Sequence, residues 1–162
     1  MKEINGFILS DDLTIITDYK GDKKEVVLPK GVKSISQYAL MDKGFTKIIL
    51  NDELESIGFR ALQGNDFEVI IIPKNVIEIS SCAFNVCYKL KRIAILNPNA
   101  LFAIDCFDHC YEIEDIYFNG NYEQLKEAFY DEEEMSWIYL DSESVKIHLI
   151  DGAIIRAGEQ WN

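Results

Sequence analysis

Four cysteines and two histidines are the side chains of this sequence best suited to metal binding or nucleophilic chemistry. The cysteines are Cys82, Cys87, Cys106 and Cys110, and His109 immediately precedes the last of them. Common structural zinc sites use C-x2-C pairs, whereas the spacings here are x4 and x3. We therefore expect no metal site and no cofactor.

Catalysis by a cysteine requires a base close to the thiol. His109 is next to Cys110 in the sequence, but adjacent side chains usually point apart. His148 lies in the alternating run 145–150, where we expect it to pack or to form a hydrogen bond. The chain also lacks a Gly-rich phosphate loop, an HExxH motif and a GxSxG motif. The sequence predicts no catalytic residues and no enzyme.

Two of the cysteines occupy equivalent places in a repeat, which gives them a simpler interpretation. Cys87 and Cys110 are 23 residues apart, as are Phe84 and Phe107. Stacked repeats would make these cysteines compact side chains of a core. A disulfide between Cys87 and Cys110 is geometrically conceivable between adjacent rungs, although a cytoplasmic chain would keep both thiols reduced.

The repeat itself recurs every 22 residues over three copies, and a looser fourth copy follows with a step of 23. It begins at Glu25 with EVVLPKGVKSISQYALMDKGFT, at Lys47 with KIILNDELESIGFRALQGNDFE and at Val69 with VIIIPKNVIEISSCAFNVCYKL. The equivalent apolar positions are Leu28, Leu50 and Ile72; Val32, Leu54 and Val76; Ile35, Ile57 and Ile79; and Ala39, Ala61 and Ala83. An apolar pattern with this fixed period predicts a solenoid, in which each repeat buries its apolar face against a neighbour.

The third copy carries the fullest motif, with Ile70, Ile72-Pro73, Val76, Ile79, Ala83-Phe84, Cys87 and Leu90. This pattern resembles the BspA-type leucine-rich repeat, whose form is roughly IxIPxxVxxIxxxAFxxCxxLxx. The resemblance covers residues 25–118 well, although the first copy has no Cys and the second has Asn51 in place of the Pro. It implies a leucine-rich-repeat fold and, as for repeat proteins generally, a role in protein binding. It names no partner.

We expect a β-rich solenoid, in which short parallel strands stack in about 4–5 rungs. The chain would be a single domain over 1–162, with an N-terminal cap over 1–24, repeats over 25–118 and a C-terminal cap over 119–162. The expected strands are 26–28, 48–50, 70–72, 93–95 and 116–118.

Both ends of the stack carry segments that fit the role of caps. Two strand-like runs, 4–9 and 13–19, flank Ser10-Asp11-Asp12, which predicts a β-hairpin. Asn121 can cap a helix over about 122–135. The run 145–150 reads as a strand, and Asp151-Gly152 predicts a hairpin turn before a second strand at 153–155.

Strand alternation predicts one exposed apolar column on the outside of the stack. If alternate strand residues face the core, then Val27, Ile49, Ile71, Ala94 and Tyr117 face outward, with Lys47 and Arg92 in a partly charged flanking column. A contiguous exposed apolar patch usually marks a contact surface. Two alternatives remain open: β-branched residues simply suit strands, or a cap covers the column.

The net charge of −12 argues against binding to nucleic acid or to anionic membranes. We expect a non-enzymatic protein-interaction module that binds a protein partner through the exposed strand face. An acidic mimic that blocks a basic nucleic-acid-binding site on another protein is the alternative, and self-association through the same face is a third. The first residues, MKEINGFILS, lack the features of a signal peptide. The sequence therefore favours a cytoplasmic location, unless a leader has been removed from it.

Overall fold

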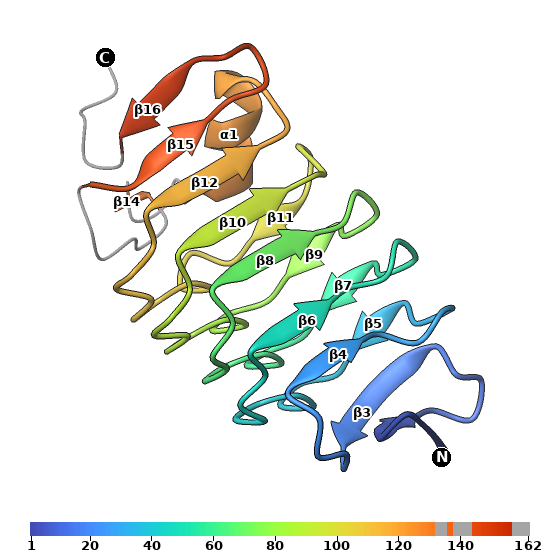
Figure 1. Ribbon diagram of the computed structural model, residues 1–162. Helices are drawn as coiled ribbons and strands as arrows, with labels where there is room; N and C mark the ends of the chain where they lie inside the picture. Colours follow the sequence, from blue (N-terminus) through green and yellow to red (C-terminus); the bar gives the residue numbers. More distant parts are fainter. Residues whose placement is uncertain (132–135, 138–143, 157–162) are drawn as a thin grey trace.

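The chain winds into a stack of coils, each of which contributes short strands to two sides of the stack (Figure 1). This architecture is seen in a computed structural model that describes residues 1–131, 136–137 and 144–156. The described part contains one short α-helix, α1, near the C-terminal end of the stack. The predicted β-solenoid is confirmed.

The first side of the stack consists of the strands that the 22-residue repeat predicts. They are β4 (Glu25–Val27), β6 (Lys47–Ile49), β8 (Val69–Ile72), β10 (Arg92–Ile95) and β12 (Asp115–Phe118). Equivalent residues face one another in parallel register, as in the pairs Val27↔Ile49 and Ile71↔Ala94. The period of the sequence thus becomes the register of the sheet, because each repeat closes one coil.

The second side is a seven-stranded sheet that the sequence analysis did not predict. Its order is β1-β2-β3-β5-β7-β9-β11. The members are β1 (Lys2–Ile4), β2 (Phe7–Leu9), β3 (Ile15–Tyr19), β5 (Ser34–Ile35), β7 (Ser56–Ile57), β9 (Glu78–Ile79) and β11 (Leu101–Phe102). Four of these strands have only two residues, too few to show the alternation by which a strand is recognised in a sequence.

A third set of backbone hydrogen bonds joins the coils where the chain turns between the two sides. In one coil the amides of Tyr38, Leu40 and Asp42 donate to carbonyls of the next coil, at 2.9–3.0 Å. Equivalent bonds recur in the following coils, except that the Cys82 amide donates to Asp105 Oδ1, at 3.3 Å, in place of a carbonyl. The turns require left-handed backbone at Tyr38 and Asp42 (φ +61° and +54°) and at the equivalent positions of later coils. Each coil is therefore tied to its neighbour on more than one side.

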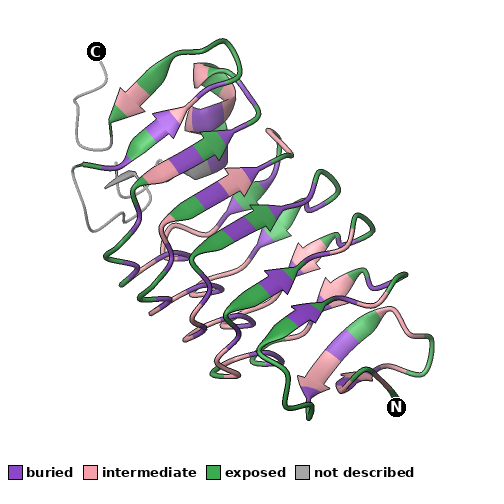
Figure 2. Cartoon of the chain, viewed as in Figure 1, coloured by how far each residue is buried: buried purple, intermediate pink, exposed green. Residues whose placement is uncertain are grey.

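The core runs the whole length of the stack, as the buried positions in Figure 2 show. The repeated columns predicted to face inward are buried, including Ile35, Ile57 and Ile79 at 0–1% exposure. A column of aromatic residues, Phe45 and Phe67, fills the space beside them. No coil could bury these side chains alone, which is why the coils must stack.

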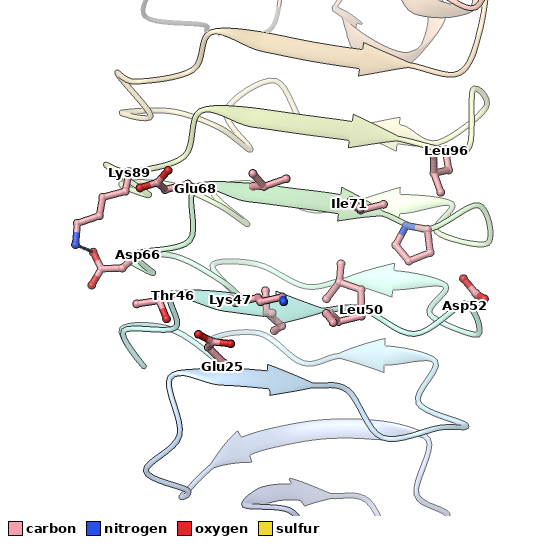
Figure 3. Close-up of a pocket in the computed structure, with 14 residues that line it drawn as sticks. Glu25, Thr46, Lys47, Leu50, Asp52, Asp66, Glu68, Ile71, Lys89 and Leu96 are labelled. Atoms are coloured by element: carbon pink, nitrogen blue, oxygen red, sulfur yellow. Dashed lines mark ion pairs between the residues drawn. The ribbon is translucent and has the colours of Figure 1, made fainter.

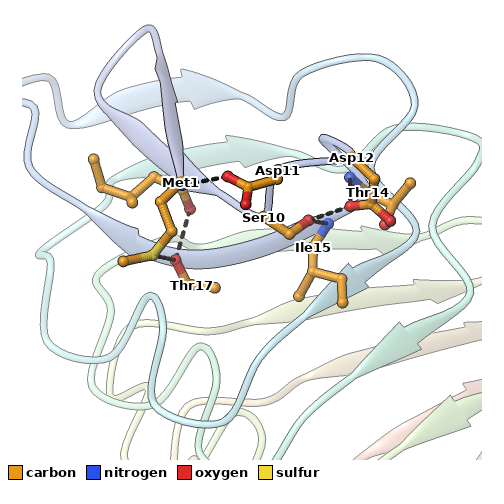
Figure 4. Close-up of polar contacts among 8 residues, drawn as sticks. Met1, Ser10, Asp11, Asp12, Thr14, Ile15 and Thr17 are labelled. Atoms are coloured by element: carbon orange, nitrogen blue, oxygen red, sulfur yellow. Dashed lines mark hydrogen bonds and ion pairs between the residues drawn. The ribbon is translucent and has the colours of Figure 1, made fainter.

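The N-terminal cap is a three-stranded meander. The predicted hairpin around Ser10-Asp11-Asp12 is present between β2 and β3. Its turn is held by side chains: Ser10 Oγ donates to Asp12 Oδ1 at 2.5 Å and accepts the Ile15 N–H at 3.0 Å, while the N-terminal ammonium pairs with Asp11 (Figure 4). β3 then pairs in parallel with β5 and starts the second side.

The interpretation of residues 4–9 as one strand is wrong. The run is broken at Asn5-Gly6, where both residues have positive φ, +51° and +85°, and β1 and β2 form an antiparallel hairpin around them. Asn-Gly is the sequence most typical of a tight two-residue hairpin turn, because both residues tolerate left-handed backbone.

The C-terminal cap contains α1 (Tyr122–Phe129), which contacts β11, and a hairpin of β15 (Lys146–His148) and β16 (Ile154–Arg156). Asn121 caps the helix as predicted: its Oδ1 accepts the Gln124 N–H at 3.0 Å, and Gln124 Oε1 accepts the Asn121 N–H at 3.1 Å. The turn at Asp151-Gly152 is also confirmed, since β15 and β16 are antiparallel.

The predicted extension of the helix to residue 135 is wrong. The helix ends at Phe129, and β13 (Tyr130–Asp131) pairs with β14 (Ser136–Trp137). Residues 131–134 are all acidic, and negative charge in the last turn of a helix opposes the helix dipole. Residues 132–135 lie outside the described part of the chain.

Candidate functional site

The predicted apolar column, which we call the stripe, lies on the outside of the first side. It comprises Val27, Ile49, Ile71, Ala94 and Tyr117. Val27 is 58% exposed, Ile49 47%, Ile71 54% and Tyr117 46%, while Ala94 is half-buried. Their neighbours along each strand, such as Ile48 and Ile70, face the core. The predicted orientation of the strands is therefore confirmed, and a row of apolar side chains meets solvent.

The sheet that carries the stripe is interrupted in the middle. β4 pairs only with β6, whereas β8, β10, β12, β15 and β16 form a separate sheet. Across the described residues, no strand pairing joins β6 to β8, although the coils that contain them remain bonded through β7 and β9. The interruption is local to this side of the stack.

The amides of Val69 and Leu50 show the interruption most directly. The Lys47 and Arg92 amides donate to the Lys24 and Glu68 carbonyls of the preceding coil, at 3.2 and 3.1 Å. Val69 stands at the same place in the repeat, yet its amide does not bond to the equivalent carbonyl, that of Thr46.

At the other end of the strands, the Leu28 amide donates to the Ile49 carbonyl at 2.9 Å. The equivalent bond, from Leu50 to Ile71, is missing. Pro73 contributes to the break. Leu96 occupies the equivalent position one coil later, and its amide donates to the preceding coil at 3.0 Å, whereas Pro73 has no N–H to donate.

A groove of about 620 Å³ lies over this interruption. Its lining residues are Glu25, Thr46, Lys47, Ile48, Ile49, Leu50, Asp52, Asp66, Glu68, Val69, Ile71, Pro73, Lys89 and Leu96. Figure 3 shows that the charged side chains gather at the end where the strands begin, with Asp52 apart, and that Leu50, Ile71 and Leu96 lie toward the other end. The groove thus has a polar end and an apolar end.

Negative charge predominates in the groove. Four carboxylates line it, against two lysines. Lys89 pairs with Asp66 at 3.2 Å, and Glu68 pairs with Lys91 at 3.5 Å. Glu25 and Lys47 form no ion pair in the part of the chain that the structure describes, although their strands pair and place them opposite each other. The unpaired Glu25 carboxylate and the local acid excess favour a ligand with a positive charge.

The predicted binding residues are divided by the groove. Ile49, Ile71 and Lys47 line it. Val27, Ala94, Tyr117 and Arg92 lie on the same side of the stack but outside it. Sequence reasoning missed the contributions of Asp52, Asp66, Pro73, Lys89 and Leu96, which lie in the turns on either side of the strands. Only three-dimensional closure of the coil brings those turns beside the stripe.

At its C-terminal end the stripe continues onto β15. Tyr117 is paired in register with His148, and the two rings stack with centroids 4.5 Å apart. His148 Nε2 also lies 2.7 Å from Asp115 Oδ1. The prediction that His148 packs and forms a hydrogen bond is confirmed.

The cysteines lie in and beside the core. Cys87, Cys106 and Cys110 are buried, and Cys82 is half-buried. Cys110 Sγ donates to the Phe84 carbonyl at 3.1 Å, and Cys87 Sγ lies 3.5 Å from the Leu62 carbonyl one coil earlier. Hydrogen bonding to Cys87, together with burial, raises the pKa of Cys110 well above its usual value. Burial does the same for the pKa of Cys106. These thiols are poor nucleophiles.

Asn65 takes the place of the cysteine in the second coil. It is 1% exposed, and its Nδ2 donates to the Leu40 carbonyl at 2.9 Å, just as Cys110 donates to Phe84. The column therefore serves to bridge successive coils, and a polar donor rather than a sulfur is its common feature.

The other chemically capable side chains do not converge. His109 is exposed and contacts Asp108 Oδ2 at 2.9 Å, while the Cys110 side chain next to it points into the core. Cys82 Sγ lies 3.3 Å from Asp105 Oδ2. Burial would raise the pKa of Asp105, but hydrogen bonds from Ser81 and Cys82 lower it overall. Among the described residues, no three His, Cys, Asp or Glu side chains group so as to hold a metal ion.

Comparison with solved structures finds leucine-rich-repeat proteins of bacteria. A leucine rich cell surface protein from Faecalibacterium prausnitzii aligns at a TM-score of 0.59 and 18% identity, over 77% of this chain and 40% of that one. The pneumococcal vaccine antigen PcpA aligns at 0.59 and 19%, over 90% and 41%. The leucine-rich-repeat protein of T. pallidum aligns at 0.52 and 20%, over 72% and 71%.

The chain thus spans about two fifths of the length of the first two of these proteins. At such low identity the similarity establishes the fold alone. Comparison with curated protein sequences gives no significant match. No helix in the described residues is long and apolar enough to cross a membrane, and the cytoplasmic location stays a prediction.

The family model described as "BspA type Leucine rich repeat region (6 copies)" matches residues 16–136. The match begins within β3 and continues past α1, so it includes parts of both predicted caps. The chain belongs to the BspA-type leucine-rich-repeat family.

Proposed function

We propose that this protein is a non-enzymatic interaction module that binds a segment of another protein in the groove between β6 and β8. The observation that carries the proposal is the exposed pair Ile49 and Ile71 at a groove of about 620 Å³. That volume is within the roughly 300–1,000 Å³ typical of ligand-binding clefts. Leucine-rich-repeat proteins commonly serve as protein-interaction modules, which supports the same reading.

The lining favours a segment that has both apolar and basic side chains. Apolar side chains of the segment would pack against Ile71, Pro73 and Leu96, and this contact would favour binding because it removes apolar surface from water. A Lys or Arg would meet Glu25 at the polar end, because no residue of the described chain forms an ion pair with the Glu25 carboxylate. Such pairs at the rim contribute more to specificity and to the association rate than to affinity.

The non-enzymatic part of the proposal rests on the side chains that are available. The groove is lined by carboxylates, lysines, Thr46 and apolar residues, and within the described chain no histidine or cysteine borders it. The Cys106 and Cys110 thiols are buried in the core, and both have raised pKa values. Binding, without chemistry, accounts for these features.

The test is a selection of binding peptides from a random ten-residue library, followed by calorimetry with three variants. Ile49→Lys and Ile71→Lys place a charge on the groove wall, and each should weaken binding at least about tenfold. Ile77→Lys is the matched control, because Ile77 is 59% exposed and does not line the groove. Equal affinity for all three variants would contradict the proposal, and so would a library that yields no binder sensitive to Ile71→Lys.

An acidic mimic remains the second candidate, and the net charge of −12 is the observation that favours it. A partner of that kind would contact charged side chains spread over the surface, so the Ile71→Lys substitution would leave its affinity almost unchanged. Self-association through the stripe is a third candidate. It predicts that the sedimentation coefficient of the protein rises with concentration and that Ile71→Lys abolishes the rise.

A further inference from the structure

The groove offers more than side chains, because main-chain groups at its floor have lost their usual partners. The Val69 and Leu50 amides lack the cross-coil bonds that equivalent amides make elsewhere, and these two amides form no other hydrogen bond in the described chain. The carbonyls that should accept them, those of Thr46 and Ile71, are left without an amide donor. All four residues line the groove.

Their arrangement follows the strands. Thr46 and Val69 lie at the beginning of β6 and β8, while Leu50 and Ile71 lie toward their ends. Each end of the groove therefore presents one free N–H and one free C=O. Ile48 and Leu50 are only 5% and 7% exposed and belong to the core, so they form the floor of the groove.

Unpaired strand edges of this kind are templates for pairing with another extended chain. Nearly all main-chain N–H and C=O groups in proteins form a hydrogen bond. Water would bond to the four free groups of the groove in the absence of a ligand, and the ligand would replace it. The other sides of the same two coils stay bonded, through β7 and β9 and through the turns, so the open groups persist in a folded stack.

We infer that the groove recognises an extended peptide segment through its main chain, by hydrogen bonds to the free groups of Thr46, Leu50, Val69 and Ile71. The inference rests on the proposed function and adds the form of the occupant: a segment in β conformation, with a basic side chain toward Glu25 and apolar side chains toward Leu96. The acid excess of the lining supports the basic residue. Alternate side chains of a strand point to opposite faces, so only every second residue of the segment would be selected for its side chain.

Hydrogen exchange of the free protein provides the first arm of the test. The Val69 amide should exchange at least about tenfold faster than the Arg92 amide, its equivalent one coil later, and the Leu50 amide faster than that of Leu28. Addition of a peptide selected as above should then slow Val69 and Leu50 while Arg92 and Leu28 change little. Exchange at Val69 and Leu50 that the bound peptide leaves unaltered would overturn the inference.

The second arm replaces single amides of the selected peptide by esters, which removes one N–H donor and keeps the side chains. At one or more positions the ester should weaken binding by about threefold to tenfold, as expected for one hydrogen bond. If every ester stays within about twofold of the parent peptide, main-chain recognition is overturned, even where Ile71→Lys still abolishes binding. If Ile71→Lys has no effect, the proposed function itself fails. The two failures are therefore distinguishable.

Discussion

Replacement of Asn65 by Ala should be among the most destabilising single changes to a polar side chain of this protein. Asn65 is 1% exposed and makes three short side-chain hydrogen bonds: its Oδ1 accepts the Phe45 N–H at 3.0 Å, and its Nδ2 donates to the Leu40 and Leu62 carbonyls at 2.9 and 2.8 Å. Two of these bonds join the first coil to the second. Asn65 also precedes Asp66, which lines the groove.

The magnitude follows from the number of bonds. Each buried hydrogen bond contributes about 1 kcal/mol net, and the loss is larger when the partner group stays buried without a replacement. Three bonds predict a loss of about 3 kcal/mol from a free energy of unfolding of about 5–15 kcal/mol. For a chain of this length, that loss should lower Tm by about 6–12 °C.

Urea unfolding followed by circular dichroism, with a reductant present, measures the effect. Asn75→Ala is the control, since Asn75 is exposed and its side chain donates one bond, to the Asp52 carbonyl at 2.6 Å; we expect it to cost no more than about 0.5 kcal/mol. Asn65→Cys should recover part of the loss, because cysteines occupy the same column in the next two coils. An Asn65→Ala variant as stable as Asn75→Ala would refute the reasoning.

Three further predictions concern the turns, the thiols and the charge. Val86→Gly should raise the free energy of unfolding by about 1 kcal/mol, since a β-branched residue at φ +52° is strained. Gly64→Ala, at the same place one coil earlier, should lower the free energy of unfolding, because alanine is strained at the Gly64 φ of +69° and the Asp42 carboxylate must also move away from the new β-carbon. Equal midpoints in urea would contradict both predictions. Iodoacetamide should modify folded protein at Cys82, the one cysteine that is not buried, and mass spectrometry that finds the other three labelled at the same rate would be inconsistent with the packing. Between about 0.05 and 0.5 M salt, the affinity for a groove-bound peptide should change little, whereas the affinity for a basic partner that this protein binds as an acidic mimic should fall steeply. A steep fall for the groove-selected peptide would favour the charge-based alternative.

The sequence predicted the first side of the stack well, for a physical reason. The apolar columns that begin at Leu28 and Ile35 repeat without a gap, and a strict period leaves the coils one register in which the residues of these columns are buried. The outward direction of Ile49 and Ile71 followed from strand alternation alone. Their role in binding remains a prediction.

The parts that the sequence did not predict depend on closure of the coil. Strands of two residues, such as β5 and β7, have no alternation to detect, and their pairing is imposed by the stacking of the coils. The left-handed turn positions were also missed, because residues such as Tyr38 and Val86 occupy them where Gly would be the usual signal. Asp66 and Leu96 are 30 residues apart in the sequence, and only closure of the coils places them at opposite ends of one groove.

The most direct test of the central claim is a methyl NMR titration of isotopically labelled isoleucines with the library-selected peptide. Binding at the interruption between β6 and β8 predicts that the Ile49 and Ile71 methyl signals shift most, while those of Ile77 and Ile150, which are exposed outside the groove, stay in place. Shifts confined to Ile77 or Ile150, with Ile49 and Ile71 unmoved at saturation, would contradict the claim.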